Sequence, residues 1–144
     1  AMDNRGMTPL QRACDAGRAE VVSILLQRGA DPAQAPDEDG FTSLMCASES
    51  YQRDGSDHVA VIRLLLKNGR VPVDARGHRG ETALWWACHA GHTERVRVLV
   101  LEGRADHAKA DDQGITPMAV AEHRGRRDCV RLLQVRGQSK LLLV

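Results

Sequence analysis

The stretch Gly6-Met7-Thr8-Pro9-Leu10, with an alanine three residues later, recurs three more times along the 144-residue chain. The later copies are Gly40-Phe41-Thr42-Ser43-Leu44, Gly80-Glu81-Thr82-Ala83-Leu84 and Gly114-Ile115-Thr116-Pro117-Met118, and each again has an alanine three residues on. Successive threonines of these copies are separated by 34, 40 and 34 residues. The spacing therefore predicts four tandem repeats.

A second anchor fixes the length of each copy. A glycine closes an apolar run in every copy, at positions 29, 69, 103 and 137. It lies 21 residues after the threonine in three copies but 27 residues after it in the second, which therefore carries a six-residue insertion. The insertion falls around Ser48 to Asp57 and contains Tyr51, the one tyrosine of the chain. We weigh a functional loop and a merely tolerated one equally, because insertions in stacked repeats cost little free energy.

The residue types in each copy predict two helices. The threonine can cap the first helix by accepting a backbone N–H of its first turn, and Pro9 and Pro117 suit the first helical position. Gly17, Gly91 and Gly125 can end the first helix in the left-handed conformation. The glycine that closes each apolar run is expected to end the second helix in the same way. One helix pair of this size cannot bury its own apolar face, so neighbouring copies must stack.

A period in the thirties, with threonine, proline, leucine and alanine at these offsets, resembles the ankyrin repeat. The resemblance covers nearly the whole chain and implies an all-α solenoid of stacked helix–turn–helix units with β-hairpin-like fingers between them. The resemblance implies one ankyrin-repeat domain at residues 3–137, with repeats at about 4–37, 38–77, 78–111 and 112–137. Residues 138–144 are either a C-terminal tail or the start of a continuation, and we favour the continuation.

Composition and charge restrict the class of function. A net charge of +1 does not favour general nucleic-acid binding, and no apolar run approaches the 18 residues of a membrane span. The common catalytic motifs are missing from the sequence, so we expect neither an enzyme nor a cofactor. The cysteines at 14, 46, 88 and 129 form no CxxC pair, which indicates free thiols inside the cell, in the cytoplasm or nucleus. Zinc is not expected at Cys88 and His92, because their side chains should diverge.

The resemblance implies that a partner lies across the finger tips and the inner helix faces. Trp85 replaces the usual histidine of the pattern and leans toward this concave groove, whereas Trp86 takes a position where a core leucine is usual. Tryptophan is the residue most enriched at interface hot spots. Met7, Phe41 and Ile115 are apolar where the family usually faces outward. They form either an exposed apolar line or a contact with the adjacent finger.

The leading hypothesis is a scaffold or adaptor module, monomeric, that binds another protein or an extended peptide and no small molecule or membrane. Arg76 and Arg79 belong to the candidates because the second finger is basic whereas the first is acidic. The full set of residues predicted to contact the partner is Trp85, Phe41, Arg79, Arg76, Glu81, His89 and Tyr51.

Other functions stay open. A second hypothesis is a substrate-docking or regulatory domain of a larger enzyme. A third is nucleic-acid or phosphate binding through the arginines between positions 124 and 136, although a solvated outer face explains them better. A cage for a methylated lysine needs two or three convergent aromatics, and only Trp85 with Tyr51 or Phe41 is on offer. Arg95 stands where an apolar residue is usual, so it either displaces its helix or extends to solvent.

Overall fold

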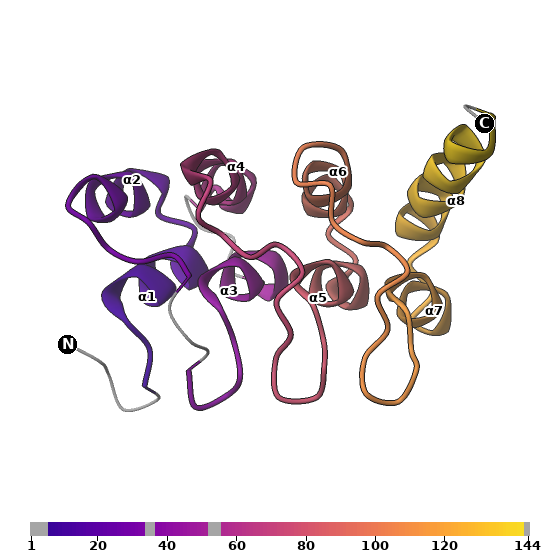
Figure 1. The fold of residues 1–144 in the computed structure, drawn as a ribbon, viewed down its shortest axis with the longest axis horizontal. Coiled ribbons are helices and arrows are strands. Elements are labelled where there is room, and N and C mark those ends of the chain that lie inside the picture. The colour runs from indigo at the N-terminus through magenta and orange to yellow at the C-terminus, as the bar shows by residue number, and fades with distance from the viewer. Residues whose placement is uncertain (1–5, 34–36, 52–55, 143–144) are drawn as a thin grey trace.

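The computed structural model describes residues 6–33, 37–51 and 56–142, and it confirms an all-helical solenoid. Figure 1 shows α1, α3, α5 and α7 side by side in one row and α2, α4, α6 and α8 in a second row. The segments between α2 and α3, α4 and α5, and α6 and α7 project from the first row, and we call them fingers 1, 2 and 3. The helices are α1 Pro9–Ala16, α2 Ala19–Gln27, α3 Ser43–Glu49, α4 His58–Asn68, α5 Ala83–Ala90, α6 Thr93–Leu101, α7 Pro117–His123 and α8 Arg127–Leu142.

Each first helix begins after a capping threonine, as the sequence predicts. The hydroxyl oxygen of each threonine accepts the backbone N–H three residues on, at 3.1 or 3.2 Å. Thr8 makes a complete capping box, because Gln11 Oε1 also accepts the Thr8 N–H at 2.8 Å. Pro9 and Pro117 occupy the first helical position, where a missing N–H costs nothing.

The glycines end the first helices as expected, but the prediction fails at two of the second helices. Gly17, Gly91 and Gly125 have φ values of 69°, 77° and 69°, which is the left-handed conformation. The predicted helix end at Gly137 is wrong, since α8 continues to Leu142. Glutamine, lysine and leucines follow this glycine, and a single glycine costs a helix only about 1 kcal/mol. The predicted left-handed conformation at Gly103 is wrong too, because after α6 it is Arg104 that has a positive φ, of 54°.

The core lies between the two rows of helices. Ala47, Ala87 and Ala121 are fully buried, and their small side chains let successive first helices approach closely. The second helices contribute the larger apolar side chains to it, among them Val22, Val61, Ile62, Leu65, Val96, Leu99 and Leu133. The four cysteines are buried and free, as predicted. Burial raises the pKa of Cys14 to about 12, so this thiol stays uncharged at neutral pH.

Polar side chains bond each repeat to the one before it. His58 Nε2 lies 2.8 Å from the carbonyl of Asp15, at the end of α1. His92 Nε2 lies 3.3 Å from the carbonyl of Glu49, at the end of α3, and Arg126 Nε donates to the carbonyl of His89 at 3.2 Å. A residue at the start of α4, α6 and α8 therefore partners a carbonyl near the end of the first helix of the repeat before it.

Arg95 makes a further link that the sequence did not predict. Its Nη1 donates to the carbonyls of Ala47, Ser48 and Ser50 at 3.0, 3.4 and 2.7 Å. Burial lowers the pKa of Arg95 to about 10, so it remains charged at neutral pH. Both predicted roles, displacing the helix or extending to solvent, are therefore wrong, because Arg95 caps α3 where the insertion begins.

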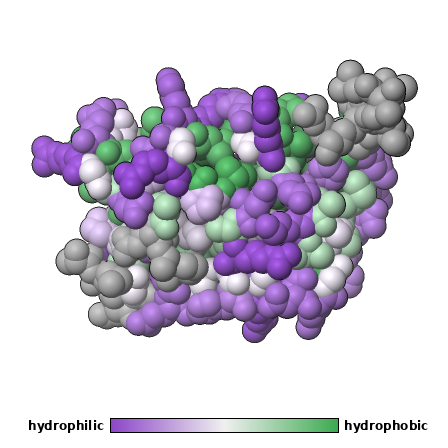
Figure 2. Space-filling model, in the orientation of Figure 1, coloured by the Kyte–Doolittle hydropathy of each residue, from purple (hydrophilic) through white to green (hydrophobic). Residues whose placement is uncertain are grey.

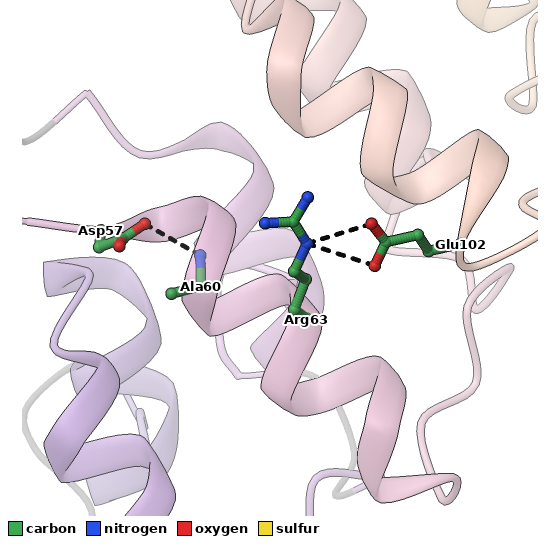
Figure 3. A network of polar contacts seen from close by, with 4 residues as sticks. All are labelled: Asp57, Ala60, Arg63 and Glu102. Atoms are coloured by element: carbon green, nitrogen blue, oxygen red, sulfur yellow. Dashed lines mark hydrogen bonds and ion pairs between the residues drawn. The ribbon is translucent and has the colours of Figure 1, made fainter.

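The second row is held together partly at its surface. Asp57 accepts the Ala60 N–H at 3.0 Å and so caps α4, as Figure 3 shows. Arg63 on α4 pairs with Glu102, just after α6, with Nε 3.1 and 3.3 Å from the carboxylate oxygens. Both side chains are about half exposed, so this pair adds at most about 1 kcal/mol. Figure 2 shows apolar surface gathered over this upper row, while hydrophilic side chains cover the finger end.

Replacing Arg95 with methionine tests its capping role. Arg95→Met removes the hydrogen bonds that Arg95 donates to three carbonyls near the end of α3, and we expect it to lower the free energy of unfolding by about 2 kcal/mol. Arg97→Met is the matched control on the same helix, because Arg97 makes only an exposed pair with Glu94. Urea unfolding followed by circular dichroism measures both, and equal losses in the two variants would contradict the assignment.

The pH dependence of stability tests the link made by His92. Burial, and then the charge of Arg95, lower the pKa of His92 to about 4, against an ordinary value of 6.5. Between about pH 6.5 and pH 4, His92 is therefore protonated in the unfolded chain but neutral in the folded chain, so stability falls as the pH drops through this range. We expect His92→Gln to remove on the order of 1–2 kcal/mol of this loss, measured by urea unfolding at pH 7 and pH 4.5. A pH dependence identical to that of the wild type would refute the assignment.

Candidate partner-binding face

Each finger ends in a tight turn that fixes the residue before the capping threonine. A main-chain bond closes the three turns, from Asp37 N–H to the Phe41 carbonyl, from Gly77 to Glu81 and from Asp111 to Ile115, at 2.8–3.0 Å. In finger 1, Asp37 Oδ1 also accepts the N–H groups of Asp39 and Phe41, each at 2.9 Å. One carboxylate oxygen of Asp37 therefore stabilises the turn. Phe41 and Glu81 hold equivalent positions in their repeats, each directly before the capping threonine of a first helix.

Four ring side chains form a continuous cluster across finger 1 and α5, and we call it the ring cluster. The ring centroids of Phe41 and Trp86 are 5.0 Å apart, and those of Trp85 and Trp86 are 4.9 Å apart in an edge-to-face arrangement. His89 stacks on Trp85 with a centroid distance of 5.2 Å and an interplanar angle of 13°. All four side chains are only partly buried. The cluster therefore offers aromatic surface to solvent at the junction of the second and third repeats.

The third repeat also holds polar atoms without partners. Among the described residues, Glu81 Oε1, Trp85 Nε1 and His89 Nδ1 are buried and make no hydrogen bond. These residues are spaced four apart, which places them along one side of α5 and the turn before it. Burial, with Arg124 and Arg126, lowers the pKa of His89, so its ring is neutral at pH 7.

An acidic hollow of about 80 Å³ lies beside Phe41, between the first two repeats. Burial raises the pKa of Glu49, and the nearby charge of Asp15 raises it further, while Arg95 opposes both effects. Arg95 is itself engaged with backbone carbonyls. The residues that line this acidic hollow are Met7, Asp15, Asp37, Asp39, Phe41, Cys46 and Glu49.

Four of the seven predicted contact residues lie together in or next to the ring cluster: Phe41, Glu81, Trp85 and His89. Arg79 is exposed on finger 2, and Arg76 is exposed too, although its Nη2 donates to the Ala110 carbonyl of finger 3 at 3.1 Å. Tyr51 is 49% exposed, and its ring contacts His92 at 5.2 Å. Tyr51 therefore belongs to the insertion end of the repeats, not to the ring cluster.

Two interpretations of the sequence do not hold in full at this face. Trp86 packs against the core as predicted but is only partly buried, and its ring lies against Phe41. Met7 is fully buried, so the exposed apolar line expected from Met7, Phe41 and Ile115 does not exist. The predicted set also left out Asp15 and Glu49, which lie seven residues after a capping threonine, the position that His89 holds in its own repeat.

Other features of the described residues give less support to a binding site than the ring cluster does. A broad groove of about 630 Å³ between α6 and α8 is lined by apolar Leu101, Leu132 and Val135 with charged side chains at its edges. Within residues 6–33, 37–51 and 56–142, no three acidic, histidine or cysteine side chains are grouped to hold a metal ion. No helix in the same ranges is long and apolar enough to cross a membrane.

Comparison with known proteins agrees with this geometry. A family model for ankyrin repeats in three copies matches residues 1–76 and 55–141. The chain belongs to the ankyrin-repeat family. Ankyrin repeats generally serve as protein–protein interaction modules and typically have no enzymatic activity.

Two curated relatives illustrate how the ankyrin repeats of this chain compare. The chain is 35% identical over 88 residues to the ankyrin repeat and KH domain-containing protein mask-1 of Caenorhabditis elegans, covering 60% of this chain and 3% of that protein. It is 34% identical over 93 residues to the mouse ankyrin repeat domain-containing protein 63, covering 62% of this chain and 22% of that protein. The chain therefore matches only a small part of the length of these relatives.

The stacking of His89 on Trp85 can be followed by fluorescence, because the chain has only two tryptophans and both lie in the ring cluster. Protonation of a stacked imidazole quenches indole emission, and the lowered pKa of His89 predicts a quenching transition centred below pH 6.5. We expect His89→Gln to abolish this transition, while His123→Gln, at the equivalent position of repeat 4, leaves it in place. A transition that survives in the His89 variant would contradict the stacked geometry.

Proposed function

We propose that this ankyrin-repeat chain is an adaptor module that binds a protein through an extended peptide segment, laid along the fingers and the first helices. The ring cluster carries the proposal. Aromatic side chains that stay partly exposed on a rigid helix supply large contact area at little cost in conformational entropy. The acidic hollow next to Phe41 adds charge that selects among partners.

The arginines of the last repeat support nucleic-acid or phosphate binding less well. Arg126 donates to the His89 carbonyl and so serves the stacking of repeats. The ring cluster lies beside the acidic hollow, at the junction of the second and third repeats. Acidic side chains repel a phosphate backbone, so the combined surface suits a polypeptide better.

A display library of twelve-residue peptides tests the proposed binding face. Peptides selected on the wild-type chain should bind the double variant Trp85→Ala/Arg79→Glu at least roughly 30-fold more weakly, which is the loss of one hot-spot side chain. Far-ultraviolet circular dichroism and the melting temperature should stay close to those of the wild type, because Arg79 is exposed and Trp85 is only partly buried.

Arg131→Glu is the matched control, because Arg131 is exposed on α8, away from the fingers. This variant should bind the selected peptides as tightly as the wild type. Undiminished binding by the double variant, or an equal loss in the Arg131 variant, would move the binding face away from the ring cluster.

A further inference from the structure

The unpartnered atoms of the third repeat point to the kind of side chain that this face receives. Glu81 Oε1, Trp85 Nε1 and His89 Nδ1 are the buried side-chain polar atoms without a hydrogen bond in the described part of the chain. Leaving such a group unpaired is costly, because burial takes away its hydrogen bonds to water and gives none in return. Native proteins rarely leave buried polar groups unpaired, and here all three fall in one repeat, which indicates that a ligand supplies the missing partners.

Glu81 is the strongest of these indicators. Its side chain is only 8% exposed, and a carboxylate at that depth is costly unless it is paired with a donor. Neither of the ion pairs seen between described residues includes Glu81. The turn beside it is closed by main-chain atoms alone, from Gly77 N–H to the Glu81 carbonyl at 2.8 Å. The Glu81 carboxylate has no structural task in finger 2, and it lacks a cationic donor.

The rings of the ring cluster suit a planar cation. Trp85 follows Glu81 by four residues. The ring centroids of Trp85 and Trp86 are 4.9 Å apart, and the ring of Phe41 lies against that of Trp86. The negative faces of such rings attract cations, and a guanidinium group can stack on them. The indole N–H of Trp85 needs an acceptor, which the main-chain carbonyl of a bound peptide provides.

We propose that the site formed by Glu81, Trp85, Trp86 and Phe41 binds an arginine side chain of the partner segment. The guanidinium donates to the Glu81 carboxylate and lies on an indole face, while a backbone carbonyl of the same segment accepts the Trp85 Nε1–H. This inference rests on the proposed function and adds the chemistry that the partner presents.

Arginine fits this site better than lysine for two reasons. Its guanidinium is planar and can donate to both oxygens of a carboxylate while it stacks on a ring. It is also more weakly hydrated than an ammonium, so bringing it to a carboxylate as buried as that of Glu81 costs less.

The charges on either side of the site give the arginine a direction of approach. Phe41 belongs both to the ring cluster and to the acidic hollow, which the carboxyl groups of Asp15 and Glu49 also line. On the other side, Arg124 and Arg126 are close enough to His89 to lower its pKa. The arginine is therefore drawn in from the side of the first two repeats and repelled from the side of the fourth.

Titration of the indole N–H resonances tests the proposal, because the chain gives only two such signals. The probe is an eight-residue alanine–serine peptide with one central arginine, and the comparison peptides carry citrulline, lysine or trimethyl-lysine at the same position. We expect the arginine peptide to shift the Trp85 indole signal and to bind most tightly. Glu81→Gln should weaken this binding roughly tenfold or more, and Trp85→Phe, which keeps a ring but loses the donor, should weaken it several-fold.

Glu122→Gln is the control, because it removes an exposed carboxylate from α7 and should not change the affinity. Glu81→Gln is isosteric, and an unchanged melting temperature will show that the variant is folded. Equal binding of the citrulline, lysine or trimethyl-lysine peptide, or unweakened binding by Glu81→Gln, overturns the arginine assignment. If no arginine peptide binds while library peptides still depend on Trp85 and Arg79, this inference falls and the proposed function stands.

Discussion

Carbonyl groups at the ends of very short helices are the constraint on which this structure depends. The first helices have seven or eight residues, and the last four carbonyls of any helix have no partner within it. About half of the carbonyls in each first helix must therefore find a donor elsewhere. His58, His92 and Arg126 supply one from the next repeat, and Arg95 supplies a further set for α3. Stacking thus satisfies the backbone as well as the apolar surface, so one repeat is incomplete without its neighbour.

These stacking links leave other positions free for binding. They use the start of each second helix, the alanines between first helices and the apolar side chains of the second row. In the third repeat, the side chains of the residue before the capping threonine, and of those three and seven after it, make no hydrogen bond to a neighbouring repeat. These positions hold Glu81, Trp85 and His89, which are the residues with unpartnered polar atoms. The fold tolerates them because repeated stacking contacts elsewhere supply the stability, and a functional site can then occupy the free face.

The sequence predicted features that are set locally and failed where distant residues meet. Threonine caps and left-handed glycines depend on a few neighbouring residues. The predicted caps, and the predicted left-handed glycines at the ends of α1, α5 and α7, were correct. The capping role of Arg95 could not be predicted, because it depends on α3, more than 40 residues earlier in the chain. The contact of Trp86 with Phe41 was missed for the same reason, since Phe41 comes from another repeat. The predicted helix end at Gly137 was wrong because the glutamine, lysine and leucines that follow it favour a helix.

Equivalent positions in the four repeats carry different charges, which gives the proposed peptide an orientation. Seven residues after each capping threonine lie, in order, Asp15, Glu49, His89 and His123. The first two belong to the acidic hollow, whereas the histidines lie in the half of the chain that also carries Arg124 and Arg126. A net charge of +1 conceals this separation, because the opposite charges cancel only in the sum. A segment laid along such a face is stabilised in one direction and repelled in the reverse one, so charge fixes the orientation of the peptide while the rings supply contact area.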